Sequence, residues 1–148
     1  MVNLNENIQN AIKDVKSYIP NHKHVEIVFD SKTAEPTVIE ADRSRLFQVL
    51  SNILKNAIKF TEEGTILVTL EERGGQAIVS IRDTGVGIDS EIFPKLFTKF
   101  ATKSEQGTGL GLYLSKGIIE AHGGKIWAEN NKDGKGANFE FSLPLLSK

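Results

Sequence analysis

The chain has no cysteine among its 148 residues. This excludes disulfide bridges, thiolate zinc sites and thiol-based catalysis. An excess of charge of one sign is also missing, because 18 Lys and Arg residues stand against 19 Asp and Glu. A general polyanion binder normally has a basic excess, so we expect no nucleic-acid partner. No apolar run approaches the roughly 18 residues of a membrane-spanning helix, and the polar start MVNLNENIQN is not a signal peptide. We therefore expect a cytoplasmic chain without membrane contact of its own, free or as the cytosolic part of a membrane-bound protein.

Glycine is absent from the first part of the chain and then occurs in clusters. None of the 13 glycines precedes Gly64. Later glycines are grouped near positions 74, 85, 109, 123 and 135. Because glycine lets a backbone approach a ligand closely and adopts positive φ angles, these clusters indicate loops that surround a ligand.

The length and the hydrophobic patterning predict one domain over residues 1–148. The expected elements are a helix over 3–18, strands over 24–30 and 37–40, a long helix from the N-cap Asp42 to about Phe60, a hairpin of strands 65–71 and 76–82 joined at Gly74 and Gly75, short helical turns within 91–99, a helix over 109–122, and strands 125–129 and 137–143. This order predicts an α+β fold. We expect a two-layer α/β sandwich in which a mixed, mostly antiparallel sheet is covered on one face by about three helices.

The long helix has an apolar stripe and, beside it, an unusual polar border. The stripe, which we expect to face the core, comprises Leu46, Val49, Leu50, Ile53, Ala57 and Phe60. Asn52, Asn56 and Lys59 follow one another on the bordering face. Two interpretations are open. In the first, this face is a partly exposed polar edge or its amides are hydrogen-bonded to a neighbouring loop. In the second, an amide oxygen coordinates Mg²⁺ while the lysine contacts phosphate.

Two glycine-rich segments also allow two interpretations each. Asp83 opens the segment 83–88 (DTGVGI) directly after a predicted strand. Its carboxylate either caps a turn or accepts a hydrogen bond from the exocyclic amine of adenine, with the glycines admitting the flat base. Residues 107–112 (GTGLGL) open a helix, where free N–H groups suit phosphate but glycine also permits tight packing. Neither segment is a P-loop or a Rossmann fingerprint.

The order and spacing of these segments resemble the catalytic and ATP-binding domain of sensor histidine kinases, in the superfamily that includes DNA gyrase and mismatch-repair ATPases. Residues 42–61 are similar to the N box, 83–88 to the first glycine box, 93–100 (FPKLFTKF) to the F box and 107–112 to the second glycine box of that family. The resemblance covers nearly the whole chain. It implies a Bergerat-type ATP-binding fold with ATP and Mg²⁺ as ligands.

The resemblance also implies roles for individual residues. Asn56 would coordinate Mg²⁺ with Asn52 beside it, Lys59 would contact phosphate, and Phe60 would pack near adenine or ribose. Asp83 would bind the adenine amine, and Gly85, Gly87 and Ile88 would form the wall of the base pocket. Residues 101–107 (ATKSEQG) would form a mobile lid, and the phosphates would be held by Gly107, Thr108, Gly109, Leu110, Gly111 and Leu112. Lys103 is the candidate for the basic residue often found near the lid, although a solvated lysine there fits equally well.

The implied activity is transfer of the γ-phosphoryl group of ATP to a histidine on a separate dimerisation and phosphoacceptor domain, in two-component signalling with a downstream response regulator. His22, His24 and His122 do not fit the acceptor pattern, so we expect structural roles for all three. At the end of a helix, a cationic His122 would suit the helix dipole. No residue of the chain is a candidate general base: Asn52 stands where related hydrolysing ATPases carry a glutamate, so we expect slow ATP hydrolysis. The isolated chain is expected to be monomeric.

Two other functions remain open from the sequence. A serine kinase of the anti-sigma-factor type shares the same boxes, and phosphorylation of a partner's serine would favour it. A non-catalytic nucleotide-sensing or docking module would bind ATP without transferring phosphate. Transfer to an acceptor domain supplied in trans separates it from the histidine kinase interpretation.

Overall fold

The computed structural model describes residues 1–99, 111–132 and 134–146. Its elements, in chain order, are β1 (Val2–Asn3), α1 (Leu4–Lys16), β2 (His24–Ser31), β3 (Val38–Ile39), α2 (Arg43–Lys59), β4 (Glu63–Arg73), β5 (Gln76–Asp83), the 3₁₀ turn η1 (Phe93–Lys95), α3 (Gly111–Ala121), β6 (Lys125–Asn130) and β7 (Ala137–Pro144). Within the described residues, no helix combines the length and the hydropathy needed to cross a membrane.

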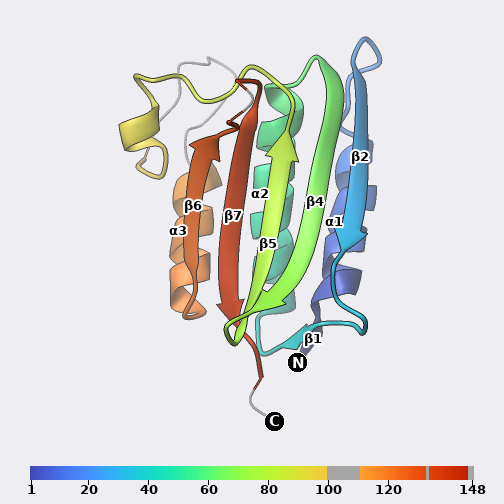
Figure 1. The fold of residues 1–148 in the computed structure, drawn as a ribbon, viewed down its shortest axis with the longest axis vertical. Helices are drawn as coiled ribbons and strands as arrows, with labels where there is room; N and C mark the ends of the chain where they lie inside the picture. The colour runs from blue at the N-terminus through green and yellow to red at the C-terminus, as the bar shows by residue number, and fades with distance from the viewer. Residues whose placement is uncertain (100–110, 133, 147–148) are drawn as a thin grey trace.

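The main sheet has five strands in the order β2-β4-β5-β7-β6. β2 pairs with β4 in parallel, and the remaining neighbours pair antiparallel. Helices α1, α2 and α3 all lie on the same side of this sheet, which makes two layers (Figure 1). The predicted α+β sandwich with a mixed, mostly antiparallel sheet is therefore confirmed.

The core lies between the sheet and the helices, with α2 at its centre. Alternate side chains of the strands point into it, among them Val68 on β4 and Phe141 on β7, because successive side chains of a strand face opposite sides of a sheet. From Leu46 to Ala57, every member of the predicted apolar stripe on α2 is buried. The prediction is wrong for Phe60, which is 38% exposed. Phe60 is the C-cap of α2, where the helical period no longer decides the direction of a side chain.

Some predicted elements differ in extent or pairing. The strand expected over 37–40 is only Val38–Ile39, and it pairs with β1 outside the main sheet. The predicted hairpin is present with longer strands, and Gly74 and Gly75 form its turn at φ of 59° and 78°. These are values that glycine adopts easily, and such turns match the twist of a hairpin. The helical turns expected within 91–99 reduce to η1.

Candidate functional site

One end of the sandwich collects the segments that the sequence singled out. The C-terminal end of α2, the loop after β5, the β6–β7 turn and the beginning of α3 lie together at the top of Figure 1. The segments come from residues far apart in the sequence. They meet because α2 and β5 both run toward this end of the sheet, while β4 and β7 start from it.

Asp83 is the buried carboxylate of this end. It is 2% exposed, and its Oδ1 accepts hydrogen bonds from the backbone N–H of Gly85 at 3.0 Å and of Ala137 at 3.2 Å. Burial raises the pKa of Asp83, and the two backbone donors oppose that rise by stabilising the charged form. Within the described residues, Oδ2 has no hydrogen-bond partner. The carboxylate is therefore held in place by one oxygen and can accept from a ligand with the other.

Asn130, the last residue of β6, and Asn131, which follows it, hydrogen-bond to the loop after β5 and to the end of β5. The Nδ2 of Asn131 donates to the Asp83 carbonyl at 2.8 Å, and its Oδ1 accepts from the Nε of Arg82 at 3.0 Å. The Oδ1 of Asn130 accepts from the Ile88 backbone N–H at 2.7 Å. The sequence pattern gave neither residue a role, because both lie between the predicted strands 125–129 and 137–143. The available signal was a pair of adjacent asparagines before Gly134 and Gly136, which is more polar side-chain capacity than a tight turn uses.

The glycines of this end have packing reasons that the structure makes explicit. A Cβ at Gly85 would collide with the Phe60 carbonyl oxygen, and a Cβ at Gly136 would collide with the Asp83 carbonyl oxygen. Gly87 has a φ of 81°, and a Cβ there would stand 2.9 Å from the Oδ1 of Asn130. The loop is also joined to α2 by a hydrogen bond from the Val86 N–H to the Phe60 carbonyl at 3.1 Å. Close contact between the loop and the end of α2 thus requires glycine at 85.

The polar border of α2 divides into two parts. The Nδ2 of half-buried Asn52 donates to the Gly111 carbonyl at 3.3 Å and to the Ser115 hydroxyl at 3.4 Å, so it joins α2 to the first turns of α3. Unlike Asn52, half-buried Asn56 makes no side-chain hydrogen bond within the described part of the chain. Lys59 is exposed, with its Nζ 5.1 Å from the ring centre of Phe60. Asn52 fits the hydrogen-bonded interpretation, whereas Asn56 and Lys59 keep their polar atoms available.

Thr61 adds an unpaired polar atom beside the loop. Its side chain is fully buried, and its Oγ1 has no hydrogen-bond partner among the described residues. This oxygen lies 2.8 Å from the position that a Cβ of Gly85 would take. Buried hydroxyl groups normally have partners, supplied by protein, water or ligand. An adenine amine and an accompanying water would satisfy Thr61 and the free oxygen of Asp83, so the residues present fit such a base.

Several candidate residues lie outside the described residues: Phe100 of the F box, the lid 101–107 with Lys103, and Gly107, Thr108, Gly109 and Leu110 of the second glycine box. The described members of that box are Gly111 and Leu112, which begin α3 and are half-buried.

The three histidines have different surroundings, and the expectation for His122 needs a correction. His22 stands 3.9 Å from Glu62, and exposed His24 begins β2. His122 was expected to be a cationic group at the end of a helix. Instead its Nε2 accepts a hydrogen bond from the Asp42 N–H at 3.1 Å, while Nδ1 lies 2.8 Å from the Ile118 carbonyl. A backbone N–H can only donate, so Nε2 is the acceptor of its pair with Asp42.

A family model described as "Histidine kinase-, DNA gyrase B-, and HSP90-like ATPase" matches residues 41–147. The chain belongs to this family.

Individual relatives narrow the likeness to sensor histidine kinases. The sensor protein KdpD of Clostridium acetobutylicum is 37% identical over 146 residues, covering 94% of this chain and 16% of KdpD. The chain therefore spans less than a fifth of that relative's length. The catalytic domain of the histidine kinase ThkA superposes with a TM-score of 0.85 at 38% identity, covering 97% of this chain and 93% of that domain. ThkA in complex with the response regulator TrrA gives 0.79 at 35% identity, covering 98% of this chain and 41% of the ThkA chain. Full-length ShkA in complex with AMPPNP gives 0.86 at 29% identity, covering 99% of this chain and 31% of that chain.

Proposed function

We propose that this chain binds Mg²⁺·ATP at the end of the sandwich where the C-terminal end of α2 meets the loop after β5. It then donates the γ-phosphoryl group to a histidine of a separate dimerisation and phosphoacceptor domain. The observation that carries the proposal is Asp83, buried and fixed through Oδ1 with Oδ2 free. Adenine presents an amine where guanine presents a carbonyl oxygen, so a fixed carboxylate selects adenine. The complex of the related ShkA with AMPPNP, an adenine nucleotide analogue, supports the same ligand class.

The phosphate end of the proposed site is the last turn of α2. Asn56 offers an amide oxygen, a ligand that suits Mg²⁺, and Lys59 offers an ammonium group for phosphate. When bound, Mg²⁺ neutralises the charge that develops on the phosphates. We also propose that Phe60 packs beside the base or ribose. Gly111, Leu112 and the candidates outside the described residues would bind the phosphates.

The chain's own residues position and neutralise; they supply no nucleophile in the proposed reaction. A nitrogen of the acceptor imidazole attacks the γ-phosphorus, the bond to the β–γ bridging oxygen breaks, and ADP leaves. Positioning of this kind accounts for most of phosphoryl-transfer catalysis. The Asn52 amide cannot accept a proton from water, and its Nδ2 is already engaged with α3. We therefore expect hydrolysis to be slow compared with transfer.

We also propose two protein partners, a phosphoacceptor domain and a response regulator. The acceptor domain lies in cis or in trans, and the phosphoryl group passes on to a response regulator, as the complex between the related ThkA and TrrA supports. Residues 1–148 act in this scheme as a single catalytic and ATP-binding unit, monomeric when isolated.

Calorimetric titration with a non-hydrolysable ATP analogue tests the site. The Asp83→Asn variant keeps the size of the side chain and an oxygen acceptor for Gly85 and Ala137, but places an amide against the adenine amine. We expect a loss of affinity of about 100-fold, in line with a lost charge-assisted hydrogen bond and an opposed donor. Asp30→Asn is the matched control, because Asp30 lies on the edge strand β2 and pairs with Lys32 instead. Equal affinity of the wild type and Asp83→Asn would contradict the adenine assignment.

Transfer in trans tests the reaction. A phosphoacceptor domain of a related sensor kinase, incubated with the chain and labelled ATP, should gain acid-labile, base-stable label on histidine. Acid-stable label on a serine of a partner would favour the serine kinase instead. Nucleotide binding without transfer to any acceptor would favour the sensing module.

A further inference from the structure

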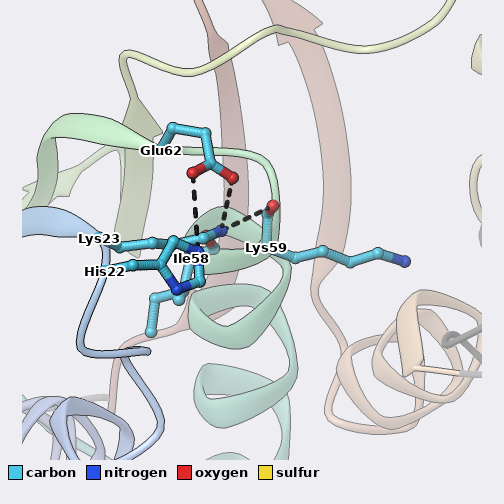
Figure 2. A network of polar contacts seen from close by, with 5 residues as sticks. All are labelled: His22, Lys23, Ile58, Lys59 and Glu62. Atoms are coloured by element: carbon cyan, nitrogen blue, oxygen red, sulfur yellow. Dashed lines mark hydrogen bonds and ion pairs between the residues drawn. The ribbon is translucent and has the colours of Figure 1, made fainter.

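Lys23 reaches the end of α2 from the segment that connects α1 to β2. Its side chain is 8% exposed, and its Nζ donates to the Ile58 carbonyl at 2.8 Å and to the Lys59 carbonyl at 3.1 Å. The same Nζ lies 3.5 Å from Oε1 of Glu62. Figure 2 shows the ammonium group between these three oxygens, with the side chain of Lys59 extending away from it. An ammonium group has three donors, and all three have protein partners here.

The carbonyl groups that Lys23 binds belong to the last turn of α2. The Ile58 carbonyl also accepts from the Thr61 N–H at 3.3 Å, whereas the Lys59 carbonyl accepts from Lys23. The last carbonyls of a helix lack intrahelical donors and carry the negative end of the helix dipole, so a cation there is favourable. Nearby, the Asn56 carbonyl accepts from the Phe60 N–H at 3.2 Å, and the Phe60 carbonyl accepts from Val86. Lys23 is the donor to the Ile58 and Lys59 carbonyls, although it lies 35 residues before Ile58 in the sequence.

The turn that Lys23 holds is the one that carries the proposed phosphate end. Asn56 and Lys59 belong to the last turn of α2, and Phe60 joins that turn to the loop after Asp83. Because its donors are already engaged and its side chain is buried, Lys23 acts on a ligand only through α2. A change at Lys23 reaches the site by moving the backbone of residues 58–60.

We propose that Lys23 is a positioning residue, whose ammonium fixes the last turn of α2 so that the Asn56 amide and Lys59 are held where Mg²⁺ and phosphate bind. This inference rests on the proposed Mg²⁺·ATP site. Glu62 has a lesser part in it, because its side chain is 74% exposed and an exposed ion pair contributes little.

The test compares the affinity for a non-hydrolysable ATP analogue with and without Mg²⁺, and takes the ratio of the two. A residue with a purely structural role lowers the folded fraction, which lowers both affinities equally and leaves the ratio unchanged. Lys23→Met keeps the apolar stem and removes the donors and the charge. We expect the ratio to fall about tenfold in this variant, the scale of one hydrogen bond to a charged group.

Three further variants sharpen the test. Asp42→Ala removes the side-chain cap at the opposite end of α2, so it should lower the melting temperature and leave the Mg²⁺ ratio unchanged. Glu62→Gln should change the ratio less than about twofold. Lys23→Gln keeps one amide donor without the charge, and should fall between the wild type and Lys23→Met.

Each outcome decides something different. A wild type whose analogue binding does not strengthen with Mg²⁺ would overturn the proposed function itself. A wild type with a clear Mg²⁺ effect, and a Lys23→Met ratio equal to that of Asp42→Ala, would overturn only the role of Lys23. If neither Lys23→Met nor Lys23→Gln folds, Lys23 is a folding residue and the positioning role is equally overturned.

Discussion

The two ends of α2 are stabilised in different ways. At the N-terminal end, the Asp42 side chain accepts from the Arg45 N–H at 3.1 Å, only three residues away. At the C-terminal end, the partners are Lys23 and Val86, both far away in the sequence. The first end has a local side-chain cap, and beside it long-range hydrogen bonds from the Asp42 N–H to His122 and from Asn7 to the Arg43 carbonyl. The second end takes its side-chain donor and its loop contact from distant segments, and we call it the assembled end. The assembled end is also the one that carries the proposed site, so variants there should change stability and binding together.

Among the single substitutions proposed here, Gly85→Ala should lower stability most, because it separates the loop after β5 from the end of α2. The new methyl group would collide with the Phe60 carbonyl, and that backbone oxygen cannot rotate away as a side chain would. We expect a loss of about 2–3 kcal/mol in the free energy of unfolding, and a loss of ATP-analogue binding, because the loop must separate from α2.

Gly117→Ala is the matched control for that substitution. Gly117 lies within α3 with open space around the position of a Cβ, so alanine should stabilise the chain by about 0.5–1 kcal/mol. Chemical denaturation of both variants measures the two changes. A Gly85→Ala variant as stable as the wild type would mean that the loop and α2 are not rigidly joined.

Asn131→Ala should have the next largest effect. Asn131 is 8% exposed, and its Nδ2 donates to the carbonyls of Asp83 and Lys135, both at 2.8 Å. Removing the side chain leaves a buried carbonyl without a donor, which costs about 1–3 kcal/mol. Analogue affinity should also fall, because the backbone of Asp83 loses its support. Asn138→Ala would be a poor control, because half-buried Asn138 accepts a hydrogen bond from Ser80. Asn21→Ala, on an exposed turn, is the better control.

Asp42→Ala should affect stability alone. Loss of a helix N-cap typically costs about 1 kcal/mol, and the proposed ligand contacts lie at the other end of the helix. Thermal melting should show the loss, while calorimetry should give wild-type affinity for the ATP analogue. A fall in affinity comparable with that of Gly85→Ala would show that the two ends of α2 are coupled, and would contradict the expectation that only the C-terminal end affects binding.

The sequence predicts the local features of this fold and misses most of the long-range ones. The Asp42 cap, the buried stripe from Leu46 to Ala57 and the Gly74-Gly75 turn are local features, and all three were predicted correctly. Phe60 was misplaced because a helical period says nothing beyond the last helical residue. Lys23, Asn130 and Asn131 were missed because their partners lie 35 to 48 residues away, as for Ile58, Ile88 and Asp83. Only the resemblance to known ATPases linked Asp83 to Asn56, since spacing alone does not bring the two segments together.

The pH dependence of stability should show the smallest effect, and it isolates Asp83 at the assembled end. Burial raises the pKa of Asp83 above its ordinary value of 3.8. The folded protein therefore holds this proton more tightly than the unfolded chain, so the contribution of Asp83 to the free energy of unfolding grows as the pH falls through the folded-state pKa toward 3.8. Above that window the buried charge lowers stability, and Asp83→Asn removes the cost. We thus expect the variant to be at least as stable as the wild type at neutral pH, with the difference shrinking as the solution is acidified.

The affinity of the wild type for the ATP analogue should fall as the solution is acidified, because protonation of Asp83 removes the acceptor for the adenine amine. Denaturation and titration of both proteins across the acidic range check the pair of trends, and a variant less stable than the wild type at neutral pH would contradict the role of burial.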